Sequence, residues 1–123
     1  MRRLMSAVLV LGALVLPTAA FAGHSDLTVP PADTFLLGGD QGAAMAVSGR
    51  NVGQTVVVIQ SRVGSVDTVI AQVAPGGTFA HDFAVGEVAL IANVSTTQAA
   101  RLSVDFTGSP ASLSMRYALP QKN

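Results

Sequence analysis

The chain of 123 residues contains no cysteine and no tryptophan, and it has only two histidines and one glutamate. Without cysteine there is no disulfide, no thiol nucleophile and no thiolate zinc site. The sequence also lacks a Walker-type phosphate loop, a Gly-x-Ser-x-Gly elbow and a His-Glu-x-x-His pair. These absences argue against the common catalytic constellations, so we expect a protein that is not an enzyme.

The chain is also poor in charge. Seven basic residues balance seven acidic ones, and loss of Arg2 and Arg3 with the N-terminal segment described below leaves five against seven. A charge this small, without a basic cluster, gives no electrostatic reason to expect nucleic acid or an anionic membrane as a partner. Aromatic residues are few as well, and most occupy apolar strand positions, whereas Tyr117 fits either core or surface. Sugar binding through exposed rings is therefore unsupported.

The N-terminus has the pattern of a cleaved signal peptide. Arg2 and Arg3 precede an apolar run from Leu4 to Leu16, and Ala20-Phe21-Ala22 supplies the small-x-small site that signal peptidase accepts. The run is shorter than the roughly 20 residues of a membrane span. We therefore expect residues 1–22 to be removed and the mature chain to be exported to the periplasm or the extracellular space, with no membrane span.

The remaining chain alternates like a set of short strands. The predicted centre is Thr78–Asn93, read as a hairpin, and Thr55–Ser61 reads as a central strand covered on both faces because its β-branched residues are continuous. Gly49 to Gly53 reads as a turn, and Gly64-Ser65 as the turn of a second hairpin. With further strands at 34–37, 43–48, 68–73, 99–106 and 113–117, seven or eight strands are expected. This spacing is typical of an all-β fold, a small antiparallel two-layer β-sandwich of immunoglobulin-like architecture.

The expected organisation is a signal peptide (1–22), an extended N-terminal arm or edge segment (23–33), a β-sandwich domain (34–119) and a C-terminal tail (120–123). Pro30-Pro31 sets the arm apart, because proline cannot donate to a sheet ladder. The strand order is left open. The predicted core consists of Val56, Val58, Val69, Ala71, Val73, Phe79, Phe83, Leu90, Leu102, Val104, Phe106, Leu113 and Met115.

The two histidines are the candidate metal ligands. Cleavage near Gly23 would leave His24 at or next to the N-terminus, where an amine and an imidazole together can bind copper, with His81 as a second imidazole. Asp26 or Asp82 could complete the site. The competing interpretations are a loose terminus for His24 and a structural histidine for His81, which shares a strand face with Phe79 and Phe83. Asn93-Val94-Ser95 also matches the glycosylation acceptor pattern.

Two functions follow from these patterns. The first is an exported, non-catalytic interaction or structural module of the cell envelope, which self-associates or binds a protein partner, for instance by adding the 23–33 arm to a neighbour's sheet edge. The alternative is a periplasmic protein that binds copper or another small ligand through His24 and His81, with Asp82 and Tyr117 as further candidate residues.

Overall fold

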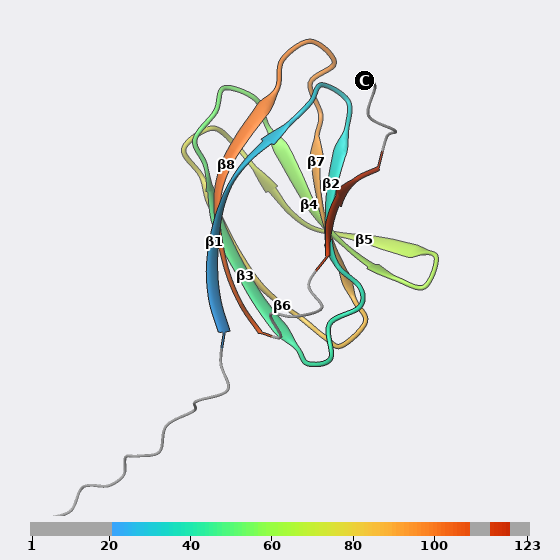
Figure 1. The fold of residues 1–123 in the computed structure, drawn as a ribbon. Coiled ribbons are helices and arrows are strands. Elements are labelled where there is room, and N and C mark those ends of the chain that lie inside the picture. Colours follow the sequence, from blue (N-terminus) through green and yellow to red (C-terminus); the bar gives the residue numbers. More distant parts are fainter. Residues whose placement is uncertain (1–20, 109–113, 119–123) are drawn as a thin grey trace, which may run out of the picture.

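The computed structural model describes residues 21–108 and 114–118, and in this part the chain forms nine strands arranged in two antiparallel sheets (Figure 1). The four-stranded sheet has the order β1 (Phe21–Val29), β8 (Ala100–Gly108), β3 (Met45–Asn51) and β6 (Thr78–Phe83). The five-stranded sheet has the order β5 (Val66–Val73), β4 (Val57–Val63), β7 (Val88–Asn93), β2 (Thr34–Gly38) and β9 (Met115–Tyr117). The predicted all-β, two-layer class is confirmed.

The connectivity is that of a jelly roll. β1 pairs with β8, β2 with β7, β3 with β6 and β4 with β5, so the first eight strands form one long hairpin wrapped around a core. β9 adds to the free side of β2. An immunoglobulin domain shares the two packed layers but has a different strand order, so the predicted likeness holds for the layers alone.

The predicted hairpin at Thr78–Asn93 is wrong. Its two strands, β6 and β7, lie in different sheets, because β6 pairs only with β3 and β7 pairs with β2 and β4. The connection turns at Gly86, whose positive φ of 82° suits glycine, and Glu87 N donates to Ala84 O at 3.0 Å. Local alternation showed that both strands have an inner face, but it carries no information on which strand each one pairs with.

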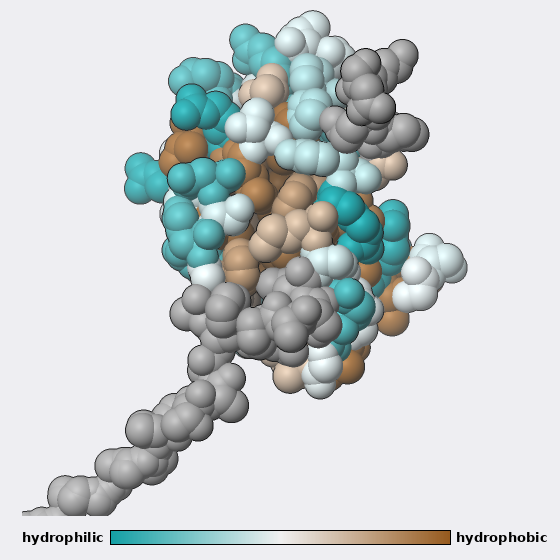
Figure 2. All heavy atoms as spheres, in the orientation of Figure 1, coloured by the Kyte–Doolittle hydropathy of each residue, from teal (hydrophilic) through white to brown (hydrophobic). Residues whose placement is uncertain are grey.

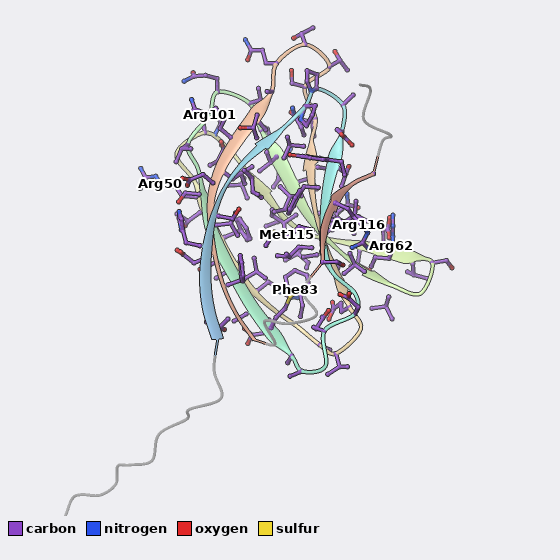
Figure 3. The ribbon with its side chains drawn as sticks, in the orientation of Figure 1. Arg50, Arg62, Phe83, Arg101, Met115 and Arg116 are labelled. Carbon is purple, nitrogen blue, oxygen red and sulfur yellow. The ribbon has the colours of Figure 1, made fainter. Side chains whose placement is uncertain are left out.

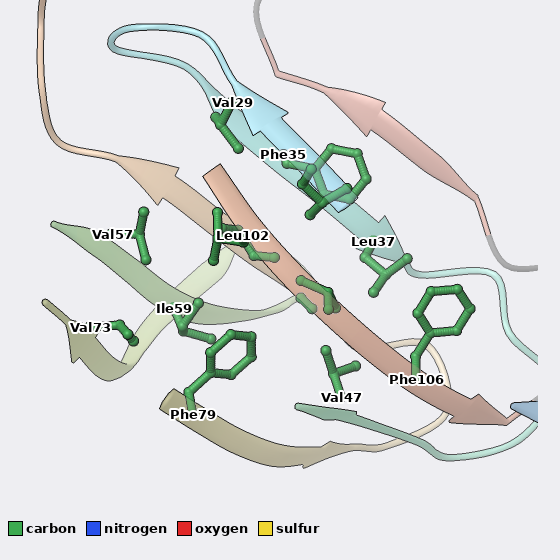
Figure 4. Packing of buried hydrophobic residues seen from close by; sticks show 14 of the residues in the cluster. Val29, Phe35, Leu37, Val47, Val57, Ile59, Val73, Phe79, Leu102 and Phe106 are labelled. Atoms are coloured by element: carbon green, nitrogen blue, oxygen red, sulfur yellow. The ribbon is translucent and has the colours of Figure 1, made fainter. Parts of the chain in front are cut away.

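The hydrophobic core fills the space between the sheets (Figure 4). Of the predicted core residues, the structure confirms Val73, Phe79, Phe83, Leu102, Val104 and Phe106 in this cluster. Ala71 packs against the cluster from a half-buried position, and Leu90 is buried outside it. In β4 the prediction has the wrong face, because Val57 and Ile59 point into the core. A continuous run of β-branched residues looks alike on both faces, so the sequence could not choose between them.

Two further residues of the predicted core are exposed. Val69 is 63% exposed, because the register irregularity at Ile70 places it opposite Gln60, on the outer face of the five-stranded sheet. Met115 is 43% exposed and lies opposite Leu37 on the short edge strand β9, in the opening between the sheets (Figure 3). On this face apolar residues gather between hydrophilic margins (Figure 2). The buried core is therefore smaller than the predicted one, because it contains only inward-facing residues that the opposite sheet covers.

The sequence predicts a turn from Gly49 to Gly53, but the first half of this segment is part of a strand. β3 continues through Gly49 to Asn51, and Gly49 lies opposite Phe79 on one side and Val104 on the other. A Cβ on Gly49 would stand 2.8 Å from the Phe79 ring and 2.9 Å from Ser103 O. The glycine is therefore explained by close packing within a sheet and not by a chain reversal.

Residues 23–33 contribute β1, which pairs along its length with β8 and forms one edge of the four-stranded sheet. This strand is joined to the opposite sheet by Tyr117, whose hydroxyl donates to Thr28 O at 2.7 Å. The Tyr117 ring meets the Phe35 ring edge-on, with centroids 5.5 Å apart. The expected signal sequence up to residue 20, the core residue Leu113 and the tail 120–123 lie outside the described residues.

Two buried asparagines connect the loops at one end of the sandwich. Asn93 Nδ2 donates to the carbonyls of Val29, Pro30 and Gln98, while Asn51 Nδ2 donates to the carbonyls of Thr55 and Val73. Asn93 is only 4% exposed. An amide nitrogen enclosed in this way is not open to glycosylation in the folded chain, so we interpret Asn93-Val94-Ser95 as a structural feature.

Candidate functional site

His24 stands on the outer face of the four-stranded sheet, between two carboxylates. Its Nδ1 lies 2.7 Å from Asp105 Oδ1 on the paired strand β8, and its Nε2 lies 3.0 Å from Asp26 Oδ1, two residues along β1. The His24 side chain is half exposed. The hydrogen bond to Asp105 and then the one to Asp26 raise the pKa of His24 above its ordinary value. The arrangement suits a doubly protonated imidazolium, because each ring nitrogen faces an acceptor.

The same geometry does not suit a metal ion. The two carboxylates bind opposite nitrogens of one ring, so the three groups do not converge on a common point. Within residues 21–108 and 114–118, no group of three or more acidic or histidine side chains is placed to hold a metal ion. This cluster is therefore an ion pair that joins β1 to β8.

His81 lies on the other side of the same sheet. On β6 it alternates inward with Phe79 and Phe83, and its ring meets the Phe83 ring edge-on at 4.7 Å. In the sheet register His24 aligns with Asp105, whereas His81 aligns with Val47 on β3. The two histidines thus face opposite sides of the sheet from its two opposite edge strands, and the structure does not bring them together for one shared ion.

Glu87 lies in the connection between β6 and β7, where it accepts two hydrogen bonds. Ser61 Oγ donates to Glu87 Oε2, and Ala84 N donates to Glu87 Oε1 at 2.7 Å. The Ser61 hydroxyl, then the Ala84 amide and the charge of His81, lower the pKa of Glu87. This cluster links the β6–β7 connection to β4. Gln41 links the same connection to the segment after β2, because its amide donates to Ala84 O and Glu87 O, both at 2.9 Å.

The remaining predicted site residues are separate from these clusters. Asp82 is exposed on the outer face of β6, and Tyr117 is the link between the sheets described above. Arg50 and Arg101 extend from the four-stranded sheet, and Arg62 and Arg116 from the five-stranded sheet (Figure 3). The arginines are thus divided between two outer faces and form no common patch, which agrees with the lack of a basic cluster in the sequence.

The β4–β5 hairpin is the surface feature that sequence reasoning missed. It projects away from the four-stranded sheet (Figure 1) and carries Val63, Val66 and Val69, which are 63%, 64% and 63% exposed. β5 is the last strand of its sheet, so the outer side of its backbone has no partner strand among the described residues. A signal was present, because Val63-Gly64-Ser65-Val66 places valines on both sides of a turn where polar residues are common.

The described residues include no helix with the length and apolar character that a membrane span requires. Comparisons with models of protein families, with curated proteins and with solved structures give no match to this chain. The candidate functional surface therefore rests on the geometry of the chain itself, and the projecting valine hairpin is its most distinctive feature.

Proposed function

We propose that the chain is an exported, non-catalytic interaction module of the cell envelope, and that it binds its partner through the β4–β5 hairpin. The observation that carries this proposal is the exposure of Val63, Val66 and Val69 on the β4–β5 hairpin, together with the outer edge of β5, which has no partner strand in the described part of the chain. Burying apolar side chains and pairing free backbone groups are both favourable, and a partner strand or sheet supplies both at once.

Export is the second part of the proposal. It is supported by Arg2 and Arg3, the apolar run Leu4–Leu16 and the site Ala20-Phe21-Ala22. Cleavage after Ala22 leaves Gly23–Val29 of β1 paired with Ala100–Phe106 of β8. The strand therefore keeps most of its ladder, including the pair of His24 with Asp105.

The experiment compares two triple variants in cells that express the full chain. In the hairpin variant Val63, Val66 and Val69 become threonine, which keeps the β-branched shape but lowers the apolar area. In the matched control three other exposed valines become threonine, at positions 52, 85 and 94. Envelope extracts are analysed by native electrophoresis, and the processed chain by intact mass.

The proposal predicts a complex larger than the monomer that the hairpin variant loses and the control retains. It also predicts a processed chain that begins at Gly23. Complexes of equal size and abundance in all three proteins would overturn the interaction role of the hairpin. An unprocessed chain in the cytoplasm would overturn export.

A further inference from the structure

The edges of the two sheets differ in how well they are protected against another strand. Lysine, proline and short length are the usual means of protection. β1 is followed by Pro30 and carries His24 and Asp26, β6 has six residues and carries His81 and Asp82, and β9 is only three residues long. β5 has eight residues without proline or lysine. Its one charge, Asp67, is already paired with Arg62 at 2.7 Å.

The exposed half of β5 is accessible on both faces as well as along its edge. All four residues from Val66 to Val69 are exposed, so neither face of this segment is covered by another part of the described chain. The register irregularity of the hairpin lies beyond them, at Ile70. An extended strand is the kind of partner that fits such a segment, because it pairs with the edge and presents side chains to both faces.

The hydrogen-bonding direction of this edge follows from the hairpin. Val63 and Val66 flank the two-residue turn at Gly64-Ser65, where Gly64 has a positive φ of 61°. A pair in that place exchanges hydrogen bonds, and the pairs of an antiparallel ladder alternate. Val66 and Thr68 therefore direct their backbone groups toward β4. Asp67 and Val69 direct theirs outward, to the open edge.

We propose that a second copy of this chain pairs antiparallel with this edge, β5 against β5, about a two-fold axis at Thr68. In this register the outward groups of Asp67 meet those of Val69 in the second copy, and the reverse pair forms by symmetry. Thr68 faces its own counterpart, in the closer pairing that does not exchange backbone hydrogen bonds. Cross-strand pairs of threonine are favourable. The two five-stranded sheets become one continuous sheet.

Three observations favour a second copy as the occupant. An antiparallel pair of identical strands is self-complementary and closes after two chains, so a two-fold axis uses both edges fully. The Arg62–Asp67 ion pair leaves the hairpin without net charge, and the chain without residues 1–22 has five basic against seven acidic residues, so copies do not repel strongly. Gly23–Val29 already pairs with β8 of its own chain, so this segment is not available to add to the sheet of a neighbouring chain. This inference rests on the proposed interaction role of the hairpin.

Single-cysteine variants test the pairing, because the natural chain has no cysteine. In Thr68→Cys the two thiols meet across the axis, at a Cα separation of about 4.5 Å that a disulfide accepts. In Val66→Cys, on the same exposed segment, the two thiols lie about 13 Å apart, from four residues at roughly 3.3 Å each. Both proteins are purified after expression of the full chain, oxidised, and analysed by non-reducing electrophoresis.

We expect at least tenfold more covalent dimer from Thr68→Cys than from Val66→Cys, and twice the monomer mass for the unmodified protein in solution. Equal cross-linking, preferential cross-linking of Val66→Cys, or a monomer at every concentration would overturn the inference. The proposed function has a separate readout. A monomer in solution together with a cell complex that depends on the three valines would overturn self-pairing and leave the interaction role standing. If there is neither a dimer in solution nor a complex in cells that depends on the three valines, self-pairing and the interaction role are both overturned.

Discussion

The hydroxyl of Thr55 donates to Asn93 Oδ1 at 3.1 Å, although 38 residues separate the two in the chain. The same oxygen accepts from Ser95 N at 2.9 Å, and the amide nitrogen of Asn93 faces three carbonyls. Both polar atoms of the side chain are thus engaged in a buried position. One asparagine thus joins the segment before β4, the loop after β7 and the turn after β1.

Asn93→Asp replaces a donor that faces three carbonyls with a carboxylate oxygen. We expect it to lower the free energy of unfolding by about 3 kcal/mol or more. The three carbonyls lose their donor, and the new carboxylate is a buried charge that faces acceptors. Urea denaturation measures the change. Gln98→Glu, the same change of an amide to a carboxylate on an exposed side chain, is the control and should stay within about 0.5 kcal/mol of the natural chain. A stable Asn93→Asp protein would contradict this account of the loops.

The His24 cluster predicts a dependence of stability on pH. The pKa of His24 is raised in the folded chain by Asp105 and Asp26, so the folded state holds the proton more tightly than the unfolded state. This contribution is fully present below the ordinary value of 6.5 and is lost as the pH rises through the folded pKa. Relative to His24→Gln, the natural chain should therefore lose stability over that range.

An NMR titration of the His24 ring provides the direct test of this cluster. Its midpoint should lie above 6.5, and Asp105→Asn should lower it because the first cause of the shift is removed. A midpoint at or below 6.5 in the natural chain would refute the ion pair.

Gly49→Ala tests the packing of β3. The added Cβ would meet both the Phe79 ring and the backbone oxygen of Ser103, and the latter cannot rotate away. We expect a loss of about 1–3 kcal/mol in the free energy of unfolding. The matched control is Gly42→Ala, where a Cβ has nothing within 4 Å and the φ angle is not positive. Equal thermal midpoints for the two variants would show that β3 has room at this position.

Tyr117→Phe removes the hydroxyl that joins β9 to Thr28 and keeps the ring against Phe35. We expect a loss of about 1 kcal/mol, the usual contribution of one hydrogen bond. Amide exchange should become faster in β9 and less so in the central strand β7. Met115→Leu, on the same strand but with an exposed side chain, is the control. Unchanged exchange in β9 would mean that the hydroxyl does not hold the two sheets together.

The fold class could be predicted because it depends on local patterns. Leu102, Val104 and Phe106 alternate with Arg101, Ser103 and Asp105, and in β8 they face the core and the solvent as expected. Pairing could not be predicted in the same way. β6 and β7 follow each other closely in sequence but belong to different sheets, and only contacts with distant strands decide that.

The candidate surface was missed for a related reason. Val69 lies in a strand whose alternation is typical of a core strand, yet the register irregularity at Ile70 places it on the outer face of the sheet, opposite Gln60. For the histidines, the sequence identified His24 and Asp26 as neighbours. It could not place Asp105, 81 residues away, against the other ring nitrogen. The pairing of β1 with β8 places Asp105 beside His24, so the predicted metal ligand forms an ion pair. No local sequence pattern contains this register.

The most direct test of the central claim is light scattering of the purified protein over a range of concentrations. The natural chain and the two triple valine-to-threonine variants, at positions 63, 66 and 69 or at positions 52, 85 and 94, are compared at equal concentration. The account predicts a dimer for the natural chain and the second variant, and a monomer for the hairpin variant. A monomer for the natural chain, or a dimer that the hairpin variant retains, would contradict pairing through β5.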